Sequence, residues 1–268
     1  MNGASGPAAG EWWGRAPEAW RDRWSVPELH LFRSIGSTND FAAERADAGA
    51  PAGTLVLAEH QSAGRGRRGR TWLAPPGSAL LLSMVYRLAA AKEGLPGAAP
   101  LHVGLAVAEA LEAVGARCTI KWPNDVLLDG AKVAGVLCEA SMGPNGGHVI
   151  AGVGVNVRQQ PGDWPPELRQ QATSLEAALG RPFDLAAVAT PLVARLLALR
   201  NVVSRTLDDD TLGRIAARDA LRGHAISIDG RDVGRADGIT TEGALRVVRH
   251  DGSVGLVHAG TVRVATEP

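Results

Sequence analysis

The sequence predicts an α+β chain built from a large mixed domain and a small C-terminal β-barrel. Apolar runs with the spacing of strands and of helices alternate along the first 220 residues. From residue 221, turn signals such as Asp-Gly recur between short strand-like runs, which is typical of a small barrel. A length of 268 residues also suits one large domain and one small one. We therefore expect a partly disordered or helical extension over 1–26, a main domain over 27–220 and a C-terminal domain over 221–268.

Composition narrows the class of protein. Lys and Arg (28) balance Asp and Glu (28), so no overall charge draws the chain to nucleic acid or to a membrane surface. Cys118 and Cys138 lie in apolar, strand-like runs and are expected in the core, not in a disulfide or zinc site. No apolar run reaches the ~18 residues of a membrane span, and the start lacks a signal-peptide pattern. These observations predict a soluble, cytoplasmic protein with no membrane partner.

Each element follows from its hydrophobic period and from the breaker residues around it. Four of the seven tryptophans precede residue 26, which favours a short docked helix over a disordered tail. Helices are expected over 11–24, 41–48, 98–114, 184–200 and 208–220, and a short one begins near 175. Strands of the main domain are expected over 29–35, 54–60, 79–87, 118–122, 126–128, 132–140 and 149–157. The small domain is expected to hold five short strands between 225 and 264.

Polar residues precede the helix expected over 41–48. Ser37, Thr38 and Asn39 carry side chains that cap helix N-termini. Exposed backbone N–H groups and hydroxyls at such a position also suit a small polar ligand. The local sequence leaves both interpretations open.

A basic, glycine-rich loop, 60–72, separates two of the expected strands. Its glycines allow the main chain to approach a ligand closely. Its arginines stay protonated and can fork onto phosphate or carboxylate oxygens. The residues concerned are Gly64, Gly66 and Gly69, and Arg65, Arg67, Arg68 and Arg70. So much uncompensated charge predicts a loop that is mobile when empty and ordered by an anion.

Three other interpretations of this loop are weaker. The spacing Gly-x-Gly-x-x-Gly matches the dinucleotide fingerprint, but Pro75 and Pro76 prevent the helix that this motif must open. The Gly-Lys-Ser/Thr end of a P-loop is absent. A solvated basic patch for nucleic acid remains possible on the loop alone, although the neutral net charge weakens it.

Two lysines lie in strands around a Pro-Asn-Asp corner. Asp129-Gly130 predicts a hairpin turn, which would bring Lys121 and Lys132 onto neighbouring strands. Strand lysines usually mark a solvent face, but two beside such a corner favour the floor of a polar pocket. In the strand 149–157, Gly152, Gly154 and Asn156 share one face, where a ligand could approach.

These motifs together closely resemble the biotin–protein ligases, also called biotin–[acetyl-CoA-carboxylase] ligases. The resemblance covers roughly residues 29–265 and implies a class II aminoacyl-tRNA synthetase-like biotin/lipoate ligase domain with an SH3-like C-terminal barrel. The motifs that carry it, in order, are Gly36–Asn39, Ala58–Trp72, Lys121–Asp125 with Lys132–Val136, and Gly152–Asn156. His60 and Thr240 depart from the family pattern, which commonly has Tyr at the first position and an acid at the second.

The resemblance implies an ATP-dependent ligase. Such enzymes convert biotin and Mg-ATP to biotinyl-5′-adenylate and then transfer biotin to one lysine of a biotin carboxyl carrier domain of an acetyl-CoA or acyl-CoA carboxylase. No covalent enzyme nucleophile is implied, so catalysis would rest on positioning and on cations that offset the approach of two anions.

The resemblance also implies roles for individual residues. The biotin-binding group is Ser37, Thr38, Asn39, Gln61, Gly64, Arg65, Gly66, Arg67, Lys132 and Gly135. The group for ATP or the adenylate is Arg65, Arg67, Arg68, Trp72, Lys121, Asn124 and Asn156. The catalytic group is Lys132, Arg65, Lys121 and Asp125, and Asp125 is also the candidate ligand of Mg2+.

Two alternatives remain beside this interpretation. A lipoate–protein ligase shares the implied fold and adenylation chemistry. A biotin-sensing DNA-binding regulator would need a helix-turn-helix unit, for which the residues before the first strand leave too little room. We therefore expect no specific DNA binding and either a monomer or a weak homodimer.

Overall fold

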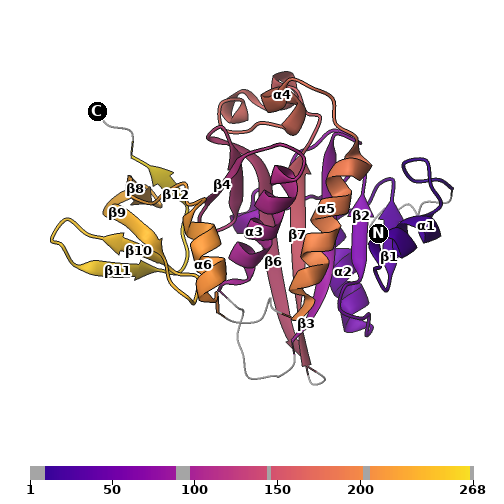
Figure 1. Cartoon of the computed structure of the whole chain (residues 1–268), viewed down its shortest axis with the longest axis horizontal. Helices are drawn as coiled ribbons and strands as arrows, with labels where there is room; N and C mark the ends of the chain where they lie inside the picture. The colour runs from indigo at the N-terminus through magenta and orange to yellow at the C-terminus, as the bar shows by residue number, and fades with distance from the viewer. Residues whose placement is uncertain (1–9, 89–96, 144–145, 202–205, 266–268) are drawn as a thin grey trace.

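The computed structural model describes residues 10–88, 97–143, 146–201 and 206–265, and combines a large mixed sheet with a small antiparallel one (Figure 1). The large sheet has the strand order β1-β2-β3-β7-β6-β5-β4. Only the pair β1 and β2 is parallel within it. Its strands are β1 (Leu29–Phe32), β2 (Leu55–Ala58), β3 (Ala79–Leu88), β4 (Cys118–Lys121), β5 (Asp125–Leu128), β6 (Ala131–Gly143) and β7 (Gly146–Asn156).

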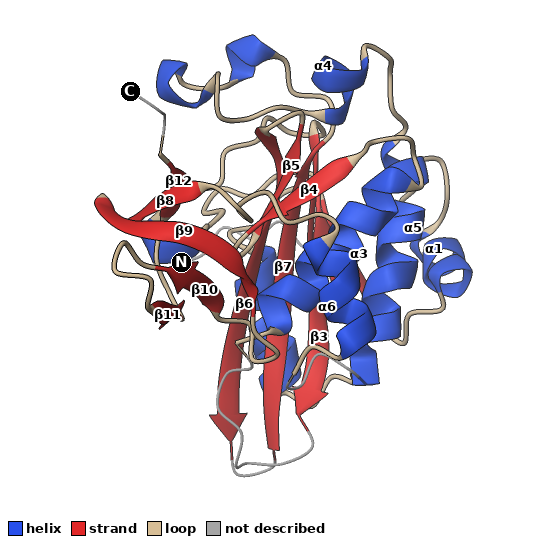
Figure 2. Ribbon diagram, turned by 60° about the vertical axis from the view of Figure 1, so that its left-hand side comes forward, coloured by secondary structure: helices blue, strands red, loops and turns tan. Residues whose placement is uncertain are grey.

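Helices cover the two faces of the large sheet unequally. Successive residues of a strand point to opposite faces, so Leu55 packs in the larger core and Val56 in the smaller one. The larger core includes residues of α3 and α5, and Figure 2 shows these two with α6 on one side of the sheet. The smaller core includes residues of α2. This helix covers only part of the second face of the sheet. The helices are α1 (Pro17–Trp24), α2 (Thr38–Asp47), α3 (Ala99–Glu112), α4 (Leu175–Leu179), α5 (Leu185–Ala198) and α6 (Asp209–Ala216).

The expected strands and helices are confirmed in order, with shifted ends. Helix α2 begins three residues earlier than expected, because the side chain of Ser37 caps it by accepting the N–H of Asp40 at 3.4 Å. Helix α1 begins at Pro17, because residues 12–15 form a small bridge instead of a first turn. The residues that connect β3 to α3 are largely 89–96, which lie outside the described ranges.

The N-terminal tryptophans dock on the body, as expected. Trp24 donates its indole N–H to Thr190 of α5 at 3.2 Å, and Trp20 donates to the backbone of Trp12 at 2.5 Å. The side chains of Trp12, Trp20 and Trp24 are all buried. The part of the extension before residue 10 lies outside the described ranges.

The C-terminal strands form a five-stranded antiparallel sheet, as the turn signals predicted. Its order is β11-β10-β9-β8-β12, and it lies beside the β4 edge of the large sheet (Figure 1). Trp122, just after β4, donates its indole N–H to the backbone of Gly243 at 2.9 Å and so joins the two sheets. The domain limits at 26 and 221 stay predictions. The strands are β8 (Ala225–Ile228), β9 (Arg231–Ile239), β10 (Leu245–Val248), β11 (Val254–Val257) and β12 (Val262–Val264).

One expectation about the lysine strands is wrong. Lys121 lies on β4 and Lys132 on β6, and these strands are not neighbours, because β5 lies between them. The hairpin turn at Asp129-Gly130 instead joins β5 to β6. Among the described residues, no helix is both long and apolar enough to cross a membrane.

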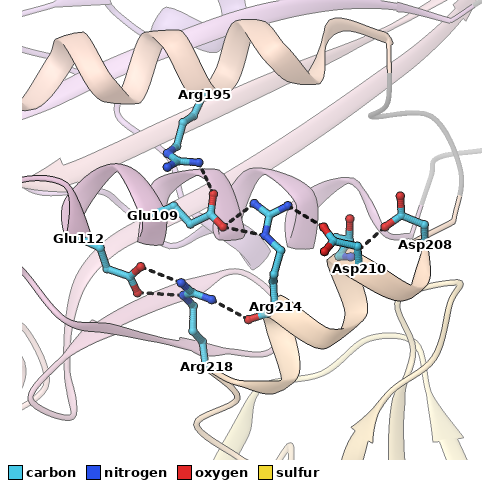
Figure 3. A network of polar contacts seen from close by, with 8 residues as sticks. Glu109, Glu112, Arg195, Asp208, Asp210, Arg214 and Arg218 are labelled. Carbon is cyan, nitrogen blue, oxygen red and sulfur yellow. Dashed lines mark hydrogen bonds and ion pairs between the residues drawn. The ribbon is translucent and has the colours of Figure 1, made fainter.

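A network of ion pairs joins the helices on the covered face (Figure 3). Glu109 of α3 accepts hydrogen bonds from Arg195 of α5 and from Arg214 of α6. Its side chain is only 10% exposed, whereas both arginines are 42–44% exposed. Arg214 also pairs with Asp210, whose side chain is 77% exposed. Burial of the shared carboxylate makes Glu109 the central member of the network.

We expect Glu109→Gln to lower the free energy of unfolding by about 1–3 kcal/mol, less than for a fully buried pair because both arginines reach solvent. Urea denaturation measures the change. Asp210→Asn is the control: it removes a carboxylate from the same Arg214 at an exposed position, and should change stability by about 0.5 kcal/mol or less. Equal losses in the two variants would contradict the central place of Glu109.

Candidate functional site

The candidate site lies on the face of the large sheet that α2 covers only in part. Two glycines occupy the middle of one cross-strand row on this face, so the floor there is flat backbone. Trp72 from the basic loop packs onto this floor, since a Cβ built on Gly154 would lie 2.5 Å from its ring. The residues of the row, in register from β3 to β4, are Leu81, Gly154, Gly135, Asp125 and Lys121.

One end of the site is polar and buried. The amide oxygen of Gln61 accepts hydrogen bonds from the backbone N–H of Thr38 at 2.7 Å and from its hydroxyl at 2.9 Å. The hydroxyl of Ser83 lies 2.8 Å from that of Thr38 and 2.6 Å from the amide oxygen of Asn39. Gly152 leaves room for this arrangement, because a Cβ there would lie 2.2 Å from Asn39. Ser37 therefore caps α2, which confirms one interpretation of the 37–39 segment, and the next two residues face the site, where ligand binding stays a prediction.

A narrow cavity of about 60 Å³ opens on these groups. It is polar at the start of α2, apolar along the sheet, and cationic at its mouth, so it suits a small ligand with a polar head, an apolar body and an anionic end. Its lining is Ser37, Thr38, Asn39, Gln61, Arg65, Gly66, Arg67, Trp72, Leu81, Leu82, Asn124, Lys132, Gly135, Val136, Leu137, Gly152, Val153 and Gly154.

A larger cavity of about 380 Å³ adjoins the first and shares Trp72, Lys132, Arg67, Gly66 and Asn124 with it. Six cationic side chains and a single acidic one line it, a charge balance that suits a polyanion. The cations are Arg67, Arg68, Arg70, Lys121, Lys132 and Arg263, and the acid is Asp125. The opposite wall includes Trp164, Leu168 and Gln171.

The surroundings of two cations in this cavity disfavour their charged forms. Burial, followed by the nearby charges of Lys132, Arg263 and Arg70, lowers the pKa of Lys121, while Asp125 opposes the shift. Burial and then the charge of Arg68 likewise lower the pKa of Arg67. Bound anionic oxygens would relieve both effects.

Lys132 lies where the two cavities meet. A β-bulge between β5 and β6 shifts the strand register beside it, and such bulges re-aim side chains. As a result Val133 and Ala134 both pack in the larger core, while Lys132 reaches the site. Its Nζ lies 2.6 Å from Asp125 Oδ1 and 5.6 Å from the centre of the Trp72 ring. Among the described residues the buried indole N–H of Trp72 has no hydrogen-bond partner.

The backbone of Lys132 is tied to the wall of the larger cavity. Its N–H donates to Gln171 at 2.8 Å, and its carbonyl accepts from Thr173 at 2.9 Å. Asn156 donates to the carbonyls of Lys132 at 3.4 Å and Thr173 at 3.0 Å, and accepts from Gln159 at 2.9 Å. The side-chain amide of Asn156, expected to bind ATP or the adenylate, therefore already makes contacts within the protein, and its contact with a ligand stays a prediction.

Two of the four arginines of the basic loop, Arg65 and Arg68, are compensated by carboxylates, contrary to expectation. Arg65 donates two hydrogen bonds to Asp40 at 2.7 and 2.6 Å, and lies 3.6 Å from Glu139. The hydrogen bond from Arg65 lowers the pKa of Asp40. Arg68 pairs with Asp229 of the small sheet. The loop is thus fastened at two points by carboxylates that lie far away in the sequence.

Arg67 differs from its neighbours. It donates to the amide oxygen of Asn124 at 3.3 Å, and no carboxylate of the described residues forms an ion pair with it. Asn124 is itself held by Val136, whose carbonyl accepts from its amide at 2.8 Å. Arg67 lines both cavities, so it is the loop arginine best placed to meet an anion.

The structure brings nearly all the expected site residues to the two cavities. Gly64 is the exception: it lines neither cavity and packs inside the loop, where a Cβ would come within 3.0 Å of the Trp72 carbonyl. Sequence reasoning missed Ser83, Asp40 and Glu139. A lone serine inside the apolar run of β3 was a usable signal for Ser83, but nothing local singled out the two acids.

The metal expected at Asp125 has few protein ligands available. The described residues contain no group of three His, Cys, Asp or Glu side chains that could hold an ion. Asp125 offers a single carboxylate, already paired with Lys132. This donor set does not fit an all-protein cage, but it fits Mg2+ that arrives on a polyphosphate, because magnesium often binds one carboxylate together with substrate phosphates.

Comparisons with known proteins place the chain in a family. The model of the biotin/lipoate A/B protein ligase family matches residues 31–156. The bifunctional ligase/repressor BirA of Bacillus subtilis is 41% identical over 155 residues, which cover 58% of this chain and 48% of that protein. The BirA of Salmonella typhimurium is 33% identical over 229 residues, covering 82% and 69%. A biotin–[acetyl-CoA-carboxylase] ligase of Mycobacterium tuberculosis is 35% identical over 179 residues, covering 65% and 66%.

A solved structure agrees with these relatives. The biotin protein ligase of Aquifex aeolicus in complex with biotin and ATP aligns with a TM-score of 0.74 and 26% identity, over 90% of this chain and all of that one. The chain spans about half the length of the Bacillus relatives. Its match to the Salmonella protein covers more than two thirds of both chains. The chain therefore belongs to the biotin protein ligases of the biotin/lipoate A/B protein ligase family.

Proposed function

We propose that this protein activates biotin with ATP to biotinyl-5′-adenylate and transfers the biotin to a lysine of a carrier protein. The observation that carries the proposal is the pair of joined cavities. One combines a polar end with apolar walls, the other concentrates six cations, and Lys132 and Trp72 lie where they meet. The Aquifex protein, solved in complex with biotin and ATP, and the biotin–[acetyl-CoA-carboxylase] ligase of Mycobacterium tuberculosis support the same chemistry.

Biotin matches the narrow cavity from end to end. Its ureido ring has both donors and acceptors, which the backbone and side chains around Thr38, Asn39 and Ser83 can complement. Its fused ring and chain are apolar, as are Leu81 of the sheet and Trp72 of the basic loop. Its carboxylate would then point to Lys132 and the larger cavity.

The larger cavity would hold the triphosphate of ATP, with Mg2+ bound to it. In the first step a carboxylate oxygen of biotin bonds to the α-phosphorus, and pyrophosphate leaves. Both reactants are anions, so the cations at Lys132, Arg67 and Lys121 would reduce their repulsion and stabilise the charge that builds on the phosphate. Asp125 would hold the Lys132 ammonium in place through their 2.6 Å contact.

The second step needs a nucleophile from outside the chain. The amine of a carrier lysine attacks the acyl carbon of the adenylate, the amine loses a proton, and AMP leaves. Lys132 would again lie beside the reacting carboxyl group and offset the charge on the leaving phosphate. The carrier is proposed to be the biotin carboxyl carrier domain of a carboxylase, following the name of the Mycobacterium relative.

Pyrophosphate release and carrier mass test the proposal directly. The chain is mixed with biotin and Mg-ATP, and a purified carboxyl carrier domain is then added for mass spectrometry. We expect biotin-dependent release of pyrophosphate and a gain of one biotin on the carrier. Release with lipoate but not with biotin would assign the sister chemistry. Absence of release with either acid, despite biotin binding, would overturn the ligase and favour a biotin sensor.

The flat floor of the site gives a second test. We expect Gly154→Ala to raise the Kd for biotin about tenfold or more, because the new Cβ would collide with Trp72 and overpacking costs about 1–3 kcal/mol. Gly162→Ala is the control, since nothing lies within 4 Å of a Cβ there. Isothermal titration calorimetry measures both variants, and equal Kd values would argue against the floor beneath Trp72.

Arg67 gives a third test, on retention of the adenylate. We expect Arg67→Gly to release free biotinyl-adenylate about tenfold faster, because one charge-assisted hydrogen bond contributes about 1.5–3 kcal/mol. The released adenylate would then label nearby proteins without selectivity. Arg222→Gly, at an exposed arginine, is the control. Chromatography of the released adenylate follows both variants, and undiminished retention by Arg67→Gly would remove the shielding role of the loop.

A further inference from the structure

The small sheet reaches the basic loop through one acidic turn. We infer that Asp229, with Thr261, is a positioning residue that fastens the loop over the larger cavity, while Arg67 remains free for the substrate. That the fastened cavity binds ATP rests on the proposed function. The fastening itself rests on contacts alone.

The contacts form a compact latch. Both guanidinium nitrogens Nη1 and Nη2 of Arg68 donate to the carboxylate of Asp229, the second at 3.0 Å. Thr261 donates its backbone N–H to the same carboxylate at 2.9 Å. Its hydroxyl accepts from Arg68 at 3.3 Å and from Arg70 at 3.0 Å. Two loop arginines are thereby joined to two residues of the small sheet.

Both acidic and basic members of the latch lie at tight turns. Asp229 has φ 49° and precedes Gly230 at φ 82°, which is the ordinary requirement of a tight Asp-Gly hairpin turn. Arg68 has φ 58° and ψ 37° and precedes Gly69 at φ 71°, and the N–H of Arg70 donates to the carbonyl of Arg67 at 3.3 Å, so Arg68 also lies in a tight hairpin turn. The contacts between Arg68 and Asp229 therefore join the tips of two turns, one in the basic loop and one beside the small sheet.

Two points within the basic loop are held by different parts of the molecule. Arg65 is held by Asp40 of α2, and Arg68 is held by Asp229 of the small sheet. Arg67 lies between these two fixed points and lines both cavities. Gly260 to Arg263 also line the larger cavity, so the small sheet forms one of its walls.

The latch is ionised at any pH used for assay, yet it is weak. The hydrogen bond from Arg68 lowers the pKa of Asp229 to about 2, so the charge of the pair persists until strongly acidic pH. The two side chains are 45% and 47% exposed, and exposed pairs of this kind open readily. A latch of this strength would hold the loop between turnovers and still release product.

Asp229→Asn removes the charge without disturbing the turn, because Asn-Gly is also favoured in tight hairpin turns. Asp232→Asn is the matched control. It lies three residues away in the same hairpin, its side chain is 63% exposed, and it contacts His250 and the backbone of Gly234 but not the loop. Equal melting temperatures of the two variants show that any difference is local.

Limited digestion of the full chain by trypsin, without ligands, tests the latch independently of activity. We expect cleavage between residues 65 and 70 to be about three- to fivefold faster in Asp229→Asn than in the wild type and in Asp232→Asn, since cleavage follows the population of the open loop. Equal cleavage rates in all three proteins would overturn the latch.

Steady-state pyrophosphate release then tests the positioning role. We expect Asp229→Asn to raise the KM for ATP about three- to fivefold with kcat little changed, and Arg68→Gln combined with it to add little further, because both remove the same contact. Additive effects would overturn the positioning role. Faster cleavage with no pyrophosphate from any protein would keep the latch and refute the ligase. Wild-type activity together with equal cleavage rates would refute the latch and keep the ligase.

Discussion

Mutual repulsion among cations is the constraint on which this site depends. Arg67, Arg68, Arg70, Lys121, Lys132 and Arg263 line one cavity, and burial there already disfavours the charge on Lys121 and Arg67. Carboxylates from three different parts of the fold offset this repulsion. Asp40 of α2, Asp125 of β5 and Asp229 of the small sheet each bind one cation at the edge of the site. The cations proposed to meet the anionic substrate are Lys132, which one carboxylate holds in place, and Arg67 and Lys121, which form no ion pair with the described residues.

The sheet supplies the rigid part of the same design. Its central strands are the longest and carry glycine at the positions where Asn39 and Trp72 press against the backbone. A flat floor therefore lies between a polar end at the start of α2 and a cationic end at Lys132. The loop that faces the ligand is rich in glycine, but the strands on both sides of it, β2 and β3, are hydrogen-bonded within the sheet.

Sequence reasoning anticipated the elements and most of the site because the motifs are local. Each motif can be recognised within a few residues. The motifs are the stretch from Gly64 to Arg70, the corner at Asp125 and the glycines of β7. What it missed depends on long-range pairing. The partners of Arg65 and Arg68 lie 25 and 161 residues away, and only the folded chain selects them. The bulge beside Lys132 shifts strand register, so simple alternation from Gly135 would have placed that lysine on the wrong face.

The hydrogen bonds between Lys132 and the segment from Gln171 to Thr173 join the lysine at the centre of the site to a connecting loop between β7 and α4. Loops of this kind usually tolerate insertion and deletion, because their backbone faces solvent. Here the last residues of the loop behave as a short extra strand on β6, and Asn156 closes the arrangement. An insertion near the C-terminal end of the loop would therefore displace Lys132, whereas an insertion around Pro161 would leave its position unchanged. The wall of the cavity and Lys132 are therefore mechanically coupled through the backbone.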